Sequence, residues 1–236
     1  MLDVAAAPAN RRVDPALARS PILHGLPPDD MSALASRFQT MSVRAGSRIY
    51  REGEHASQLY VILTGKVKLH WCAPQTCEKL LGILGPTDIF GAESIFDPGP
   101  RAGSATALTD VTLAGIDHAA LCGCVAGRPH VAVQLMRVLA RRLQRTEDLI
   151  ADLNSTDVPG RVAKQLLRLA RRFGVRTGHE LHLDHDLTQA EIAQLVGASR
   201  ESVNKAMSEF AQRRWITVRG RSLMIHRADL LVKRAR

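Results

Sequence analysis

The sequence predicts an α+β fold with a β-rich N-terminal domain, one long connecting helix and a mainly helical C-terminal domain. Three observations support this prediction. Short strand patterns broken by glycines occupy residues 41 to 120, an uninterrupted helical pattern covers residues 128–153, and two short helices separated by a glycine turn lie within residues 187–215. The chain has 236 residues, of which 45% are hydrophobic, so it is large enough for two domains that each bury a core.

The N-terminal residues give weaker signals. Residues 1–16 are rich in Ala, Pro and Arg, and we expect a flexible extension there. Short helices are expected between Leu17 and Phe38, with Asp29 or Asp30 near a helix cap. Asp3 argues against a secretion signal, and no run approaches the roughly 20 apolar residues that span a bilayer. We therefore expect a cytoplasmic protein with no membrane partner, whose four cysteines are reduced.

The first domain, residues 17–127, is expected to be an antiparallel jelly roll or barrel. Residues 59–63 form a buried apolar strand, Thr64 and Gly65 a tight turn, and residues 67–71 an alternating strand. Further strands are expected at 48–50 and 80–84, with a pair of strands within 105–116. Short strands at this spacing, separated by turn residues, are typical of that architecture.

Residues 128–153 are expected to form a dimerisation helix. Side chains at spacings of three and four make one mostly apolar stripe, which can pair with a second copy of itself. A helix with one such stripe can also lie on its own barrel. We favour a homodimer, because two-fold symmetry usually accompanies a helix-turn-helix that reads a palindrome. The expected interface residues are Leu135, Leu139, Leu143, Thr146, Ile150 and Leu153.

A hinge is expected at residues 154–160, followed by a winged helix-turn-helix domain at residues 161–236. Asp157 is a suitable helix cap, and Pro159 stands where a first helical turn tolerates proline. The next helix is expected to run from Arg161 to Phe173 and to stop at Gly174. A short strand is expected at residues 180–184.

The helix-turn-helix pattern begins at a capping box. The Thr188 hydroxyl accepts from the amide of Glu191, and the glutamate side chain reaches back to the amide of Thr188. Gly197 permits a sharp turn that a β-carbon would obstruct, and Ser199 caps a second helix. Any two-helix corner needs a cap, a glycine and apolar faces, so these residues alone do not indicate DNA binding.

The charged residues of the second helix and of the following hairpin do indicate DNA binding. Arg200, Glu201 and Lys205 face outward near the start of the helix, where its first turns can enter the major groove. Residues 215–225 form a hairpin, or wing, with Arg219 and Arg221 at its tip to touch phosphate. Residues 151–236 hold 16 Lys and Arg against 9 Asp and Glu, whereas residues 1–150 hold 16 against 14. This charge distribution suits double-stranded DNA as the partner.

The cysteines allow two interpretations. The plainer one is that they are inert thiols, because free cysteine is commonly a small buried hydrophobe. The sharper one is a redox sensor whose modification changes the long helix. An iron–sulfur cluster is not expected, because no cysteine precedes residue 72. The possible redox residues are Cys72, Cys77, Cys122 and Cys124.

No metal site and no catalytic residue is expected. His179, His182 and His185 cannot all face one way on an alternating strand, so we expect them at the solvated surface. A metal-dependent enzyme of the cupin kind would need clustered ligands inside the barrel. The histidines of the β-rich region are widely separated in sequence, which argues against an enzyme; they are His55, His70 and His118.

Several runs resemble the CRP/FNR family of bacterial transcription regulators, and within it the actinobacterial cyclic-AMP receptor proteins. They are STDVPGRVAKQLLRLARRFG at 155–174, DLTQAEIAQLVGASRESVNKA at 186–206, FDPGPR at 96–101 and LMRVLARRLQRT at 135–146. The resemblance covers residues 17–236 and includes the order of the predicted domains. It implies that the first domain is a β-roll of the cyclic-nucleotide-binding type, and that the protein works with RNA polymerase.

The resemblance also implies roles in DNA recognition. Arg200, Glu201 and Lys205 would occupy the base-reading positions, and a palindrome with TGTGA-like half-sites is expected. Arginine and lysine donate to guanine, and glutamate accepts from the cytosine amino group. The residues expected to contact phosphate and set the register are Ser199, Ser202, Thr188 and Gln189.

The effector pocket that the resemblance implies is altered in this sequence. Gly91, Ser94 and Arg101 match the family's phosphate-binding segment. The glutamate that holds the ribose has become Ala92, and the hydroxyl residue after the arginine has become Ala102. Each lost hydrogen bond is worth about 0.5–1.5 kcal/mol, so two losses should weaken cyclic-AMP binding by about tenfold to several hundredfold.

Three other residues bear on the pocket. Glu93 follows the missing carboxylate, but neighbours on a helical turn point about 100° apart, so we do not expect it to substitute. Thr146, which by resemblance reaches the adenine, is retained, although its hydroxyl can also bond its own helix. Glu147 stands where close relatives have asparagine. We expect no required cofactor, cyclic AMP as a weak effector and DNA binding largely independent of it; the alternatives are a cyclic-AMP-dependent activator of the usual type or a thiol redox-responsive regulator.

Overall fold

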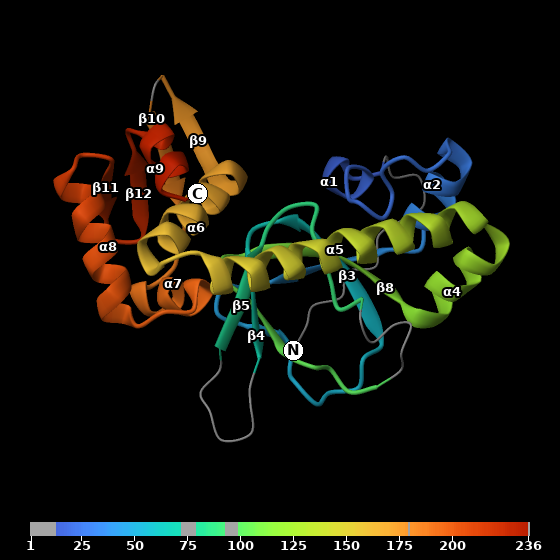
Figure 1. Ribbon diagram of the computed structural model, residues 1–236. Coiled ribbons are helices and arrows are strands. Elements are labelled where there is room, and N and C mark those ends of the chain that lie inside the picture. The colour runs from blue at the N-terminus through green and yellow to red at the C-terminus, as the bar shows by residue number, and fades with distance from the viewer. Residues whose placement is uncertain (1–12, 72–78, 93–98, 179, 236) are drawn as a thin grey trace. The chain divides into compact units, whose positions relative to one another are not determined.

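The computed structural model describes residues 13–71, 79–92, 99–178 and 180–235 (Figure 1). The chain forms two compact units, Met1–Leu143 and Gln144–Arg236. Unit 1 holds the two sheets of the β-rich part, and unit 2 holds the helix-turn-helix with a small sheet of its own, which confirms the α+β fold class. Among the helices in the described ranges, none combines the length and the apolar character that a bilayer crossing requires.

Unit 1 is built from two antiparallel sheets with the strand orders β1-β8-β3-β6 and β2-β7-β4-β5. Two short helices, α1 (Pro15–Ala18) and α2 (Pro28–Ala35), precede them. Both strands expected within 105–116 form, but they pair in different sheets, as in a jelly roll. The strands are β1 (Gln39–Val43), β2 (Arg48–Tyr50), β3 (Gln58–Thr64), β4 (Val67–Trp71), β5 (Lys79–Leu84), β6 (Ile89–Phe90), β7 (Ser104–Ala107) and β8 (Val111–Asp117).

Strand β3 is buried on both faces, which explains its unbroken apolar run. Leu59, Val61 and Leu63 point into one core that includes residues of the helices, and Tyr60 and Ile62 point into a second core shared with strands of the other sheet. Alternate residues of a strand face opposite sides, so a strand between two cores has no polar side. β3 is therefore the central element of unit 1.

Two helices follow the last strand of unit 1. The first, α4 (His118–Gly127), was not expected, because its run of small and apolar residues carries no polar face to mark a helical period. The second, α5 (Pro129–Ser155), confirms the long helix predicted at 128–153. Its first turns are fixed to unit 1, because the Gln134 amide donates to the backbone oxygens of Pro21 and His24 at 2.5 and 2.7 Å.

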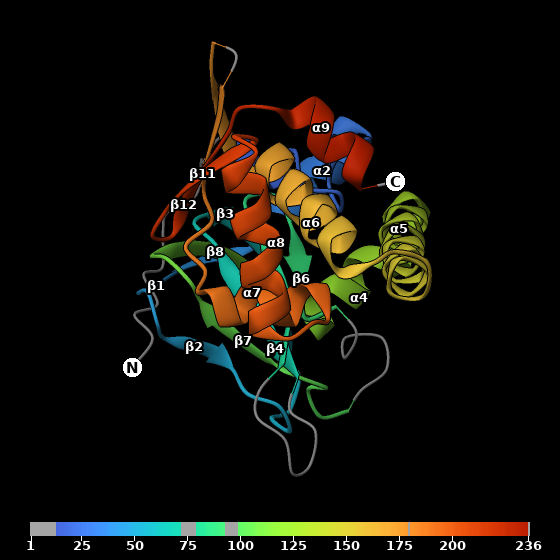
Figure 2. The ribbon, with the colours of Figure 1, turned by 60° about the vertical axis from the view of Figure 1, so that its left-hand side comes forward.

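Unit 2 combines a helical core with a four-stranded antiparallel sheet of order β11-β12-β10-β9. Helices α6 and α8 pack against each other beside this sheet (Figure 2). The predicted wing is confirmed as β11 and β12, with Gly220 at its turn in a left-handed conformation. The elements are α6 (Val158–Phe173), β9 (Gly174–Thr177), β10 (Glu180–Asp184), α7 (Gln189–Val196), α8 (Arg200–Gln212), β11 (Ile216–Arg219), β12 (Ser222–Ile225) and α9 (Ala228–Arg234).

The junction between α5 and α6 is shorter than the hinge expected at 154–160. Thr156 and Asp157 alone separate the two helices, and α6 begins at Val158 rather than at Arg161. Asp157 caps the helix by accepting from the amide of Gly160 at 3.0 Å. Pro159 lies in the first turn, where its missing N–H would have no helical partner, so it does not delay the helix.

Candidate nucleic-acid interface and effector pocket

The turn between α7 and α8 is built as the sequence predicts. The amide of Glu191 donates to the Thr188 hydroxyl at 3.2 Å, and the amide of Thr188 donates to the Glu191 carboxylate at 2.8 Å. Gly197 ends α7 with φ of 61° and ψ of 48°, a left-handed conformation that favours glycine. Ser199 then caps α8 by accepting from the amide of Ser202 at 3.1 Å.

Helix α8 buries one face and exposes charged residues on the other. Arg200, Glu201 and Lys205 are exposed in its first two turns. Hydrogen bonding to its own backbone amide, then to the Ser199 hydroxyl, holds the pKa of Glu201 below its ordinary value, with Arg200 adding to the effect. The carboxylate is therefore ionised at neutral pH and can only accept, as reading a base amino group requires. The buried face consists of Val203, Ala206, Met207 and Phe210.

The residues expected to contact phosphate differ in whether their side chains already make hydrogen bonds within the protein. Gln189 is exposed, as are Arg219 and Arg221 beside the wing turn. The Thr188 hydroxyl, in contrast, donates to Glu191 at 2.9 Å, and the Ser199 hydroxyl is hydrogen-bonded to the Ser202 hydroxyl at 3.1 Å. A phosphate contact from either hydroxyl has to replace a bond inside its cap.

In unit 1, Arg101 points inward and binds the protein backbone. Its guanidinium donates to the oxygen of Gly91 at 2.9 Å and to the oxygen of Gln58 at 2.6 Å, and it lies 4.3 Å from the centre of the Tyr50 ring. Arg101 is only 5% exposed. A β-carbon on Gly91 would lie 2.5 Å from Nη1 of Arg101, so glycine at this position leaves room for the arginine.

The other pocket residues fall into two groups. Glu93 and Ser94 lie outside the described residues. Ala102 is exposed next to Arg101, whereas Ala92 is buried in the apolar core that also contains Leu63 and Ala114. A glutamate at position 92 would enter this apolar core, so the difference from the family extends beyond one missing hydrogen bond.

Helix α5 exposes most of the predicted dimer stripe. Leu139, Leu143, Ile150 and Leu153 are among the large apolar side chains open to solvent, and Thr146 and Glu147 are also exposed. Leu135 differs from expectation: it is 5% exposed and packs in the core of its own unit, which leaves it covered within one chain. The stripe that is open to a second copy therefore begins C-terminal to Leu135 along α5.

The cysteines and histidines are distributed as follows. Cys72 and Cys77 lie outside the described residues, and Cys122 and Cys124 are free thiols on α4, half-buried and buried respectively. The redox interpretation therefore stays a prediction. His182 is exposed as expected, but the expectation for His185 is wrong: it is 2% exposed inside unit 2, where its ring accepts from the amide of Leu187 at 3.1 Å. Within the described ranges, no three His, Cys, Asp or Glu residues gather as a metal site would require.

Comparison with known proteins gives independent evidence. The chain matches the Cyclic nucleotide-binding domain family over residues 40–126 and the Crp-like helix-turn-helix domain family over residues 160–234. It is 52% identical to the CRP-like cAMP-activated global transcriptional regulator of Mycobacterium tuberculosis, over 95% of this chain and 100% of that protein. It is 33% identical to the Cyclic AMP receptor protein of Thermus thermophilus, over 90% of this chain and 95% of that protein. The chain belongs to the CRP/FNR family. The solved structure of FixK2 from Bradyrhizobium japonicum shares the fold, with a TM-score of 0.73 and 24% identity over 83% of this chain and 96% of that one.

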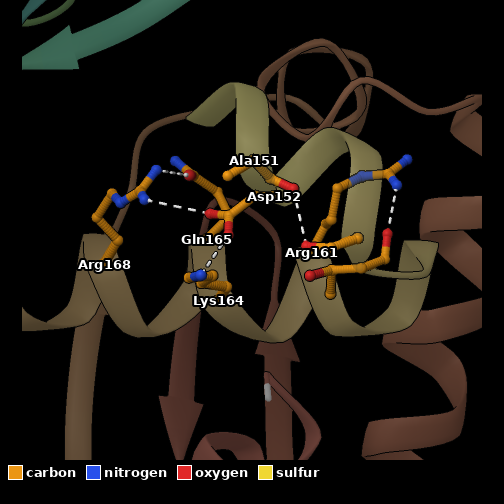
Figure 3. Close-up of polar contacts among 8 residues, drawn as sticks. Ala151, Asp152, Arg161, Lys164, Gln165 and Arg168 are labelled. Atoms are coloured by element: carbon orange, nitrogen blue, oxygen red, sulfur yellow. Dashed lines mark hydrogen bonds and ion pairs between the residues drawn. The ribbon is translucent and has the colours of Figure 1, made fainter. Parts of the chain in front are cut away.

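As a CRP/FNR regulator, the protein acts in transcription and binds DNA, and it is not an enzyme, as the sequence predicted. One residue of this regulator that sequence reasoning did not single out is Arg161 on α6. It donates to the oxygens of Val196 and Gly197 at the end of α7, at 2.8 and 3.2 Å. It also donates to the oxygen of Thr156 at 2.7 Å (Figure 3). An arginine suits the carbonyl end of a helix, but only the folded chain brings positions 161 and 196 together.

Proposed function

We propose that this CRP/FNR regulator binds, as a homodimer, a palindrome with TGTGA-like half-sites in the cytoplasm, together with RNA polymerase. The observation that carries the proposal is the exposed set Arg200, Glu201 and Lys205 on the capped first turns of α8. Arginine and lysine can donate to the major-groove edge of guanine, and an ionised glutamate can accept from the cytosine amino group. These are the contacts that such a half-site needs.

Dimerisation through α5 supplies a second copy of α8, which reads the other half-site. Four large apolar side chains of the predicted stripe are exposed along this helix, and helices with such a stripe associate to cover it. A two-fold dimer places two copies of α8 against successive turns of the major groove, about 34–36 Å apart. The palindrome then reflects the symmetry of the protein.

We further propose that cyclic AMP is a weak effector and that DNA binding is largely independent of it. Two observations support this part. Arg101, the residue expected to hold the phosphate, already donates hydrogen bonds to the backbone oxygens of Gly91 and Gln58. Alanine at positions 92 and 102 removes two ligand hydrogen bonds of the family pattern.

A second candidate function is a cyclic-AMP-dependent activator. The relative at 52% identity carries cAMP activation in its name, and the relative at 33% identity is called a cyclic AMP receptor. This candidate requires Arg101 to leave its carbonyl partners when the nucleotide binds.

One experiment tests both candidates. Fluorescence anisotropy at physiological salt compares binding to a TGTGA…TCACA duplex and to a scrambled duplex, with and without cyclic AMP. Our proposal expects a preference of 1000-fold or more, on the order of the usual specific-to-nonspecific ratio, and less than about threefold stimulation by cyclic AMP. Strong stimulation together with a low-micromolar dissociation constant by calorimetry would establish the second candidate. Equal binding to both duplexes would exclude the palindrome.

A further inference from the structure

The carboxylate of Asp152, near the end of α5, ties this helix to two successive turns of α6. It forms an ion pair and hydrogen bond with Nζ of Lys164 and lies 3.8 Å from Nη2 of Arg168 (Figure 3). Asp152 is only 15% exposed at its side chain, whereas the two cations remain more open to solvent. Lys164 and Arg168 are one helical turn apart, so a single carboxylate resists rotation of α6 about the junction.

The same junction is tied to the helix-turn-helix. Arg161 joins the Thr156 oxygen, between α5 and α6, to the Val196 and Gly197 oxygens that end α7. A methyl group of Leu153 lies 2.9 Å from the place a Gly197 β-carbon would occupy, so Leu153 packs against the turn that precedes α8. The last turns of α5, the start of α6 and the start of α8 are therefore held in one arrangement within unit 2.

We propose that Asp152 is a positioning residue that sets the half-site spacing accepted by the dimer; this inference rests on the proposed recognition of a palindrome. Ile150 and Leu153, which flank Asp152, are exposed members of the dimer stripe. Because Asp152 fixes the direction of α6 relative to this stripe, it fixes the separation of the two α8 helices in a dimer. One added base pair moves a half-site by about 3.4 Å and turns it by about 35°. A rigid junction binds such a site poorly, and a loosened junction tolerates it.

The test compares palindromes that differ only in spacer length. Anisotropy titrations at one salt concentration measure affinity for the preferred spacer and for spacers one base pair shorter and longer. For the wild type we expect the altered spacers to bind about tenfold more weakly, the effect of about 1.4 kcal/mol. For Asp152→Asn we expect a difference of about threefold or less. Asp152→Glu, which keeps the charge, should retain most of the wild-type preference.

Two further variants separate positioning from charge and from folding. Asp148→Asn removes the same charge from an exposed position one turn earlier on α5 and should behave as the wild type. A Lys164→Gln, Arg168→Gln double variant removes the partners of Asp152 and should reproduce the Asp152→Asn result. Its weaker attraction for phosphate lowers affinity for every duplex alike and leaves the ratio between spacers unaffected.

The readout distinguishes this inference from the proposed function. A base substitution at the guanine read by Arg200 should weaken binding by the same factor in all variants, because the base contacts of α8 do not involve Asp152. An unchanged spacer preference in Asp152→Asn, or an equal loss of base discrimination, would overturn the positioning role. A wild type that binds palindromic and scrambled duplexes equally would instead overturn the proposed function, and the positioning role with it.

Discussion

Replacing Arg101 by alanine should destabilise unit 1 in the absence of any nucleotide. The side chain donates to two backbone oxygens and lies over the Tyr50 ring. Its removal leaves the buried oxygen of Gly91 and the part-buried oxygen of Gln58 without these donors, and an unsatisfied buried acceptor costs about 1–3 kcal/mol. The lost cation–π contact adds about 1 kcal/mol, and relief from burying a charge offsets part of the total. We expect a net loss of about 2–4 kcal/mol in the free energy of unfolding.

Urea unfolding of the full-length, nucleotide-free protein measures this loss. Trp71 lies in unit 1, so its fluorescence reports that unit in a Trp215→Phe background. Arg44→Ala serves as control, because it removes an exposed arginine from the same unit and should change stability by less than about 0.5 kcal/mol. A loss for Arg101→Ala no larger than that of the control would show that the guanidinium is free for a ligand, and that the carbonyl contacts do not hold it.

The other predictions concern the interface, the dimer, the turn and pH. Arg200→Ala should weaken DNA binding by about 1–3 kcal/mol and relax specificity at one base pair, whereas Arg219→Ala should weaken binding to all duplexes alike. Titrations against duplexes with single-base changes measure this, and the same pattern for the two altered proteins would disprove it. Leu143→Glu should convert the dimer to monomer in sedimentation experiments, while Leu81→Glu, equally exposed at 59% against 61%, should leave it intact; dissociation by both would argue against a seam on α5. Gly197→Ala should lower the free energy of unfolding by about 1–3 kcal/mol, because the backbone is left-handed there and the new methyl group would meet Leu153. Gly220 is also left-handed but has open space around it, so Gly220→Ala should lower stability less. Equal melting temperatures for the two variants would show that the contact with Leu153 does not contribute. The hydrogen bond from Arg234, followed by that from the Gly160 amide, holds the pKa of Asp157 below its ordinary value. Stabilisation from this group is therefore present above the ordinary carboxyl pKa and is lost as the pH falls through the lower, folded value. The stability difference between wild type and Arg234→Gln should therefore shrink in acid; a difference that is as large in acid as at neutral pH would exclude the ion pair as its source.

Features set by neighbours in the sequence were predictable. The capping box at Thr188, the left-handed turn at Gly197 and the cap at Ser199 all follow from contacts within four residues. The long helix and the wing also follow from their local patterns. The resemblance of these local runs to the CRP/FNR family predicted a transcription regulator, and the comparisons confirm this prediction.

Features set by distant contacts were not predictable. Leu135 continues the helical stripe of Leu139 and Leu143, and nothing in its spacing shows that unit 1 covers it. Arg101 matches a phosphate-binding position, but the carbonyls it meets belong to residues 58 and 91. His185 follows a strand, yet it is 2% exposed, and its backbone amide donates to the oxygen of Arg221. In each case the partner is brought close only by the tertiary fold.

The burial of β3 between two cores has a consequence for how unit 1 opens. Deuterium reaches a backbone amide only when its hydrogen bond breaks, and β3 pairs with β8 along most of its length. Releasing Val61 or Ile62 would separate both cores at once, so no small fluctuation of a sheet edge frees them. The amides of this strand should exchange last in unit 1, at a rate that reports the unfolding of the whole unit.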